Sequence, residues 1–94
     1  MIVEWRPKAR EDRDNLFDYI AQDNPRAALE LDDRIEVQTD ALPKHPELYK
    51  PGRVRGTREM ILTPSYVFVY RIKKRAGVIE IVRIIGAREN YLEA

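Results

Sequence analysis

Two β-rich runs near the C-terminus, residues 66–72 and 78–85, restrict the possible folds of this chain more than any other feature. Both are dense in Val, Ile, Tyr and Phe, and a polar segment separates them. A strand directs alternate side chains to opposite faces. The first run therefore divides into one set with Tyr66, Phe68, Tyr70 and Ile72 and another with Val67, Val69 and Arg71. Both sets are largely apolar, so we expect these runs to form the centre of a sheet covered by helices on one face and partly covered on the other.

The second run predicts its own two faces in the same way. Strict alternation puts Val78, Val82 and Ile84 on one face and Ile79, Ile81 and Ile85 on the other. Glu80 and Arg83 interrupt the pattern, one on each face.

The N-terminal half predicts one short strand, at residues 1–6, and two helices. Residues 8–22 and 26–42 each carry apolar side chains at helical spacing. Between them, Asn24 can cap the second helix and Pro25 fits its first position. So short a connection makes the helices antiparallel. The side chains expected to pack on the sheet are Leu16, Phe17, Ile20, Leu31 and Ile35.

The remaining segments complete an α+β fold with the order βααβββ. Residues 43–56 contain three prolines and two glycines and predict a long loop, of a kind that is often functional. Residues 57–62 predict a strand, and Thr63-Pro64-Ser65 turns it into the next one. We therefore expect a single domain over residues 1–94, with an antiparallel α-helical hairpin packed on a small, mostly antiparallel β-sheet.

Composition excludes several classes of chemistry. The chain has no cysteine, His45 is its only histidine and Ser65 its only serine, so neither a hydrolase triad nor a Cys/His metal site is expected. We expect no cofactor and no bound metal. No apolar run approaches a membrane span and the N-terminus lacks an apolar signal core, which predicts a cytoplasmic protein without a membrane partner.

Charge is distributed unevenly along the chain. Residues 1–47 hold seven Lys/Arg against twelve Asp/Glu, whereas residues 48–94 hold ten against four. Twelve of the seventeen basic residues are arginine, whose planar fork suits phosphate and carboxylate. A basic half of this kind favours nucleic acid or an acidic protein as partner, although a merely solvated surface is the alternative. The residues that carry this hypothesis are Arg53, Arg55, Arg58, Arg71, Arg83, Arg88 and Tyr91.

Four segments, in this order and spacing, resemble the RelE/ParE superfamily of bacterial toxins. They are YIAQDNPRAA at 19–28, GRVRGTRE at 52–59, YVFVYR at 66–71 and GARENY at 86–91. The resemblance spans essentially the whole chain. It implies a growth-inhibiting toxin of a type II toxin–antitoxin module, neutralised by a cognate antitoxin in a possible hetero-oligomer.

The superfamily contains ribosome-dependent mRNA endonucleases of RelE type and DNA gyrase inhibitors of ParE type, so the target is either gyrase or the ribosome with its mRNA. For an endonuclease, the resemblance implies catalytic roles for Arg58, Arg88 and Tyr91. Met60 and Val67, however, stand where RelE-type enzymes carry a lysine and an arginine. The loss of a charge stabiliser at position 67 favours the ParE-like reading. Arg53, Arg55, Arg71 and Arg83 are then expected to bind the target or the antitoxin. A non-toxic basic binding domain is the further alternative.

Overall fold

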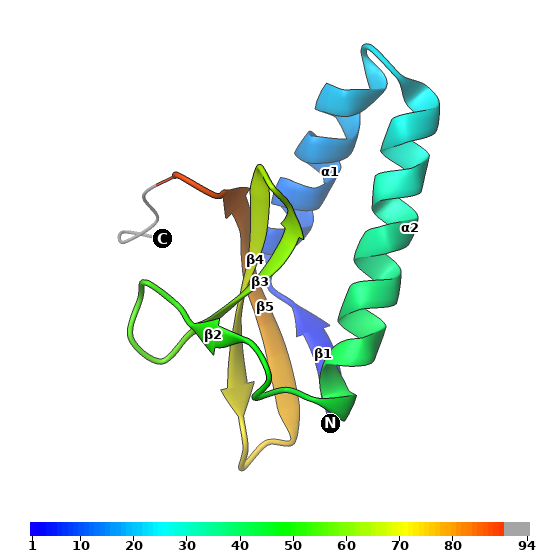
Figure 1. The fold of residues 1–94 in the computed structure, drawn as a ribbon. Helices are drawn as coiled ribbons and strands as arrows, with labels where there is room; N and C mark the ends of the chain where they lie inside the picture. The colour runs from blue at the N-terminus through cyan, green and yellow to red at the C-terminus, as the bar shows by residue number, and fades with distance from the viewer. Residues whose placement is uncertain (90–94) are drawn as a thin grey trace.

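One sheet of five strands organises the computed structural model, which describes residues 1–89 (Figure 1). Its strands lie in the order β1-β5-β4-β3-β2. Their bounds are Ile2–Trp5 for β1, Lys50–Pro51 for β2, Arg58–Thr63 for β3, Tyr66–Lys73 for β4 and Val78–Gly86 for β5. β1 pairs in parallel with β5, and all other neighbours are antiparallel. The predicted α+β fold with a mostly antiparallel sheet is confirmed, and the two runs that we expected at its centre are β4 and β5.

Two helices, α1 (Pro7–Ala21) and α2 (Pro25–Ala41), form the expected hairpin on one face of the sheet, and their connecting turn extends beyond the sheet (Figure 1). The Asn24 side chain accepts a hydrogen bond from the Ala27 backbone N–H at 3.1 Å, and Pro25 occupies the first helical turn. This is the predicted cap, and it satisfies a backbone donor that a helix start leaves unpaired. A short 3-10 helix, η1 (Leu42–Lys44), follows α2.

The helices cover an apolar core built on one face of the sheet. Leu16 and Ile35 are buried in it, Ile20 and Leu31 pack against it while partly buried, and Phe17 is half-buried. The sheet contributes Met60 and Leu62 from β3, Phe68 and Tyr70 from β4, and Ile79, Ile81 and Ile84 from β5. Among residues 1–89, neither helix combines the length and the apolar character that crossing a bilayer requires.

The face of the sheet opposite the helices, which we call the open face, carries a second and smaller apolar cluster. It consists of Val67, Val69, Val82 and Ile85, with Val54 and Ala87 packed against it. Val54 belongs to the loop between β2 and β3, which folds back over this face. Both faces of β4 are thus apolar, as its sequence predicted.

The predicted faces of β5 are wrong after residue 82, because the strand contains a bulge. Val69 pairs with Arg83 while the next residue, Tyr70, pairs with Ile81, so β5 carries one extra residue at this point. An extra residue shifts the alternation of side chains by one position. As a result Ile84 joins Ile79 and Ile81 under the helices, and Ile85 joins Val82 on the open face.

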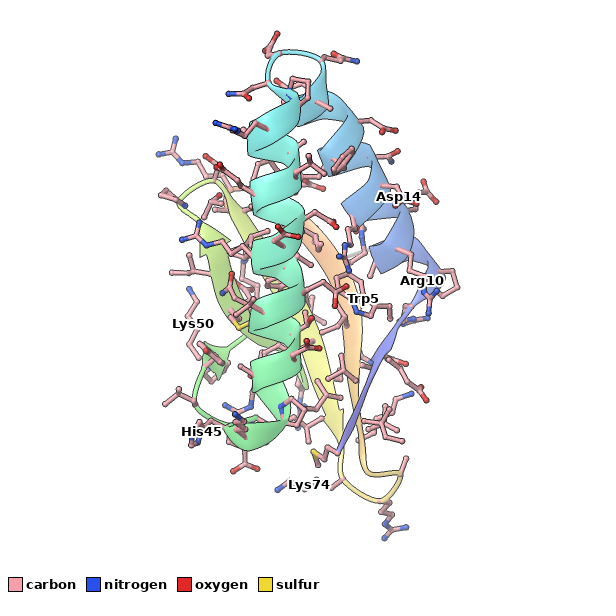
Figure 2. All side chains as sticks on the ribbon, turned by 90° about the vertical axis from the view of Figure 1, so that its right-hand side faces the viewer. Trp5, Arg10, Asp14, His45, Lys50 and Lys74 are labelled. Atoms are coloured by element: carbon pink, nitrogen blue, oxygen red, sulfur yellow. The ribbon has the colours of Figure 1, made fainter. Side chains whose placement is uncertain are left out.

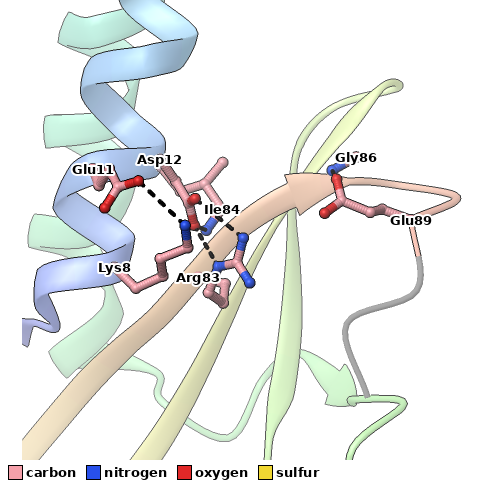
Figure 3. Close-up of polar contacts among 7 residues, drawn as sticks. All are labelled: Lys8, Glu11, Asp12, Arg83, Ile84, Gly86 and Glu89. Carbon is pink, nitrogen blue, oxygen red and sulfur yellow. Dashed lines mark hydrogen bonds and ion pairs between the residues drawn. The ribbon is translucent and has the colours of Figure 1, made fainter. Parts of the chain in front are cut away.

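The side chain of Asp12, on α1, binds β5 at this bulge (Figure 3). It accepts hydrogen bonds from Arg83 Nε at 2.7 Å, from Arg83 Nη2 at 3.2 Å and from the Ile84 backbone N–H at 3.1 Å. Both side chains of the ion pair are largely buried, at 11% exposed for Asp12 and 15% for Arg83. The hydrogen bond to Asp12 raises the pKa of the Arg83 guanidinium, which is therefore charged at all ordinary pH values. The Asp12 carboxylate thus neutralises the charge of Arg83 and also accepts the hydrogen bond of the Ile84 backbone N–H at the bulge.

The strand β2 was not predicted, because residues 43–56 were expected to form a loop. It comprises only two residues, of which Pro51 lacks a backbone N–H, and it pairs antiparallel with β3 at the edge of the sheet. A pattern of alternation cannot be recognised over two residues.

Replacing Asp12 by Ala should destabilise the fold by about 3 kcal/mol, because the change leaves a largely buried guanidinium without its counter-charge. Denaturant unfolding followed by circular dichroism measures the difference. The matched control is Lys8→Ala, which breaks the neighbouring but exposed Lys8–Glu11 pair and should have little effect (Figure 3). Equal losses in the two variants would contradict this account.

Stability should also fall at alkaline pH through Tyr70. Its hydroxyl donates a hydrogen bond to the Pro46 carbonyl at 2.7 Å, and burial raises the pKa of the phenol to about 12 from the usual 10.0. The folded state holds the proton more tightly than the unfolded state. The stabilisation is therefore complete below pH 10 and is lost as the pH rises towards 12. Unfolding measured at about pH 9 and about pH 11 should show a smaller loss in Tyr70→Phe than in the wild type; an identical loss would argue against the assignment.

Candidate functional site

A groove of about 460 Å³ crosses the open face between the β2–β3 loop and the end of β5. Its lining combines basic residues at the rim with an apolar floor. The lining residues are Lys50, Pro51, Gly52, Arg53, Glu59, Ile61, Thr63, Pro64, Val67 and Ala87. Ile61 is 64% exposed, which is high for an aliphatic side chain of a central element. We refer to this surface as the open-face groove.

The floor of the open-face groove is apolar because of strand register. Ile61 of β3 and Ile85 of β5 are the direct partners of Val67 on β4, so three aliphatic side chains form a row across the sheet. Val67 is only 5% exposed. Met60 is 1% exposed and lies on the other side, in the core under the helices. Neither position therefore supplies a cation to this face.

Arg53 and Glu59 form the polar wall of the groove. Glu59 accepts hydrogen bonds from the Arg53 backbone N–H at 2.9 Å and from Arg53 Nε at 3.1 Å. Arg53 Nη1 also donates to the Glu89 carbonyl at 2.9 Å, so the same side chain connects the β2–β3 loop with the segment after β5. The Glu59 side chain is 4% exposed, whereas that of Arg53 is 40% exposed. Part of the arginine therefore remains accessible to a binding partner.

Two glycines shape the loop that carries Arg53. The Gly52 N–H donates to the Thr57 carbonyl at 2.7 Å, and a side chain at position 52 would collide with the Thr57 hydroxyl. Gly56 has a φ of +82°, a conformation that residues with a side chain rarely adopt. The Thr57 N–H donates to the Val54 carbonyl across this turn, which directs Val54 onto the open face.

Arg58 lies outside the open-face groove. It donates hydrogen bonds through Nη1 to the backbone carbonyls of Tyr49 at 2.8 Å and Glu47 at 3.3 Å, and so holds the segment after η1 against β3. It pairs with Tyr70, whereas Gly86, two residues before Arg88, pairs with Tyr66. Four residues along a strand span about 13 Å. The backbone positions of Arg58 and Arg88 are thus separated by about half the length of β4, and the structure does not bring these two residues together.

The other predicted residues are distributed over several surfaces. Arg83 is bound to Asp12 of α1. Arg71 is half-buried on β4 opposite Glu80, and its Nε has no hydrogen-bond partner within residues 1–89. Arg55 and Arg88 are exposed, in the β2–β3 loop and in the turn after β5. Tyr91 lies outside the described residues.

Sequence reasoning missed Glu59, Ile61 and Lys50 as members of the groove. The pairing of Glu59 with Val69 and of Ile61 with Val67 contains the missing information, because it puts both β3 residues on the open face. Among residues 1–89, no three His, Asp or Glu side chains converge in a way that could hold a metal ion. An apolar floor with a partly accessible arginine at its rim is suited to binding an amphipathic, anionic segment.

Comparisons with known proteins agree with this architecture. Over residues 3–91 the sequence matches the family described as the ParE toxin of the type II toxin–antitoxin system parDE. Y4kP of Sinorhizobium fredii is 32% identical over 90 residues, which are 95% of this chain and 91% of that protein. Toxin RelE2 of Caulobacter vibrioides is 34% identical over 84 residues, or 87% of this chain and 90% of that protein.

A similar fold occurs in a solved structure of the chromosomal ParDE toxin–antitoxin system from P. aeruginosa. The TM-score is 0.80 at 26% sequence identity, and the match covers 92% of this chain and 95% of the other. Together with the match over residues 3–91, this confirms the resemblance inferred from the four sequence segments. The chain therefore belongs to the ParE toxin family of type II toxin–antitoxin systems.

Proposed function

We propose that this toxin inhibits DNA gyrase and that a cognate antitoxin neutralises it by occupying the open-face groove. The observation that carries the choice of target is the aliphatic row of Ile61, Val67 and Ile85 across the open face, of which Ile61 and Val67 line the groove. Metal-free cleavage of RNA needs several cations positioned around one phosphate together with a proton-transfer group. An apolar floor stabilises no such charge.

The placement of the arginines supports the same proposal. Arg58 binds two backbone carbonyls and is separated from Arg88 by about half the length of β4. Arg83 is bound to Asp12. Catalytic groups must be held within a fraction of an ångström of a productive geometry, and side chains that are already bound elsewhere and start four strand positions apart do not meet this condition.

A second candidate function, ribosome-dependent mRNA cleavage, is favoured by one comparison: the relative from Caulobacter vibrioides is named Toxin RelE2. In this case Arg58, Arg88 and Tyr91 would be the catalytic residues. The match to the ParE family and the similarity to a ParDE structure support the first candidate over this one.

The antitoxin is proposed from both the charge and the shape of the groove. Residues 48–94 carry a net charge of +6, and the groove has Lys50 and Arg53 at its rim and Ile61 exposed on its floor. An acidic segment with apolar side chains at alternate or helical spacing would satisfy both features. The similarity to a solved ParDE toxin–antitoxin system supports an antitoxin as the partner.

Purified toxin should inhibit supercoiling by purified gyrase, or trap cleaved DNA, and should leave mRNA intact in a translating extract. The two assays are run side by side, with primer extension as the readout for mRNA. Codon-spaced cuts that disappear in Arg88→Ala, with gyrase unaffected, would overturn the proposal in favour of the endonuclease.

Association with the cognate antitoxin should slow as salt is raised, because opposite charges steer the encounter and ions screen them. Stopped-flow or surface-based kinetics at low and high salt measure the effect. An association rate that does not change with salt would count against a charge-complementary groove.

The groove itself is tested by Ile61→Arg, which should weaken antitoxin binding roughly tenfold or more by burying a charge against an apolar contact. Val37→Arg is the matched control, because Val37 is 68% exposed, Ile61 is 64% exposed, and Val37 lies on α2 away from the groove. A loss of affinity in the control equal to that in Ile61→Arg would show that the antitoxin does not use this surface.

A further inference from the structure

Opposite charges are segregated into the two layers of the fold. The helical hairpin, residues 7–41, contains five Lys/Arg and ten Asp/Glu. Residues 42–89, which form η1, the strands β2 to β5 and the loops between them, contain eleven Lys/Arg and four Asp/Glu. The first layer therefore carries a net charge of −5 and the second of +7. A molecule polarised in this way orients in the field of a polyanion.

The exposed lysines of the second layer gather where the segment before β2 meets the β4–β5 turn. Lys74 Nζ forms an ion pair with Glu47 Oε1 at 3.0 Å, which joins these two parts of the chain. Figure 2 shows Lys74 at the end of the molecule opposite the α1–α2 turn, with Lys50 on the same half. We call this region the basic end. It consists of Lys44, Lys50, Lys73, Lys74 and Arg75, all of which are exposed.

Acidic side chains neutralise the basic end only in part. Glu47 pairs with Lys74, and Glu80 pairs with Lys73 at 3.0 Å. Within the described part of the chain, Lys44, Lys50 and Arg75 have no ion pair. The hydrogen bond from Lys74 lowers the pKa of Glu47, so this carboxylate stays ionised near neutral pH and keeps its negative charge beside Lys74. Three cations are thus left without a counter-charge.

We infer that the basic end binds the phosphate backbone of duplex DNA, independently of sequence. This inference rests on the proposed function in one respect, since it takes the polyanion to be the DNA on which gyrase acts. Phosphate binding requires exposed cations and no apolar anchor. The sequence of the β4–β5 turn, KRAG at 74–77, has this character. Protein partners, by contrast, are held by buried aromatic or aliphatic side chains. The open-face groove, which shares only Lys50 with the basic end, provides such a surface.

The separation of charge between the two layers sets the orientation of the toxin on DNA. With the basic end on DNA, phosphates repel the acidic helical hairpin, and its α1–α2 turn points away from the duplex (Figure 1). The toxin would therefore approach a gyrase–DNA complex in one orientation.

The test is binding to a fluorescent mixed-sequence duplex, followed by anisotropy over a salt titration in the absence of gyrase. Each phosphate contact contributes about −0.9 to the slope of log K against log salt. Lys74→Glu/Arg75→Glu should therefore reduce the magnitude of the slope by about 1.8 and weaken binding at low salt by tenfold or more. Arg75→Glu alone should produce about half the change in slope, and it leaves the Lys74–Glu47 pair intact.

The matched control is Arg26→Glu/Arg34→Glu, which makes the same change in net charge on α2. Both arginines are exposed and have no ion pair within residues 1–89. Wild-type affinity in this control, with the losses above in the basic-end variants, supports the inference. Equal losses in both double variants, or no binding by the wild type at low salt, would overturn it.

Two further measurements separate this inference from the proposed function. If the basic-end variant binds DNA normally but associates slowly with the antitoxin, the basic end serves an acidic protein and the inference is wrong. If the wild type binds DNA but does not inhibit gyrase in the supercoiling assay, the proposed function fails while the DNA contact stands.

Discussion

One largely buried carboxylate, that of Asp12, ties the helical layer to an irregular point of the sheet. Asp12 compensates the charge of Arg83 and the backbone N–H of Ile84, and thereby allows β5 to hold a bulge directly beneath α1. Without the bulge, strict alternation would turn Ile84 away from the helices and Ile85 towards them. The bulge that this contact holds thus places Ile84 in the core under the helices and Ile85 in the apolar cluster of the open face.

The sequence predicts the elements of this fold well and their local irregularities poorly. The apolar stripes of the two helices, the Asn24–Pro25 boundary and the alternation along β4 are repeated signals, and each was confirmed in the structure. The bulge in β5 adds a single residue and depends on Asp12, which is 71 positions away. β2 depends on its pairing with β3. Neither carries a local pattern, because tertiary contacts create both.

The candidate site shows the same limit. Sequence comparison could identify Val67 as an unusual residue, but the row that it forms with Ile61 and Ile85 follows from strand register. Likewise, a count of arginines does not distinguish Arg83, bound to Asp12, from Arg53, whose side chain is 40% exposed at the groove. Which cations remain available depends on the acidic side chains that the fold brings to each of them.

The parallel pairing of β1 with β5 has a consequence for the order in which the sheet assembles. β1 joins the sheet only through β5: residues 2–5 pair with residues 78–81, and the Ile2 N–H donates a hydrogen bond to the Gly77 carbonyl. Contacts between segments that lie far apart in the sequence form slowly. The N-terminal strand should thus be added to the sheet only after β5 has taken its place beside β4.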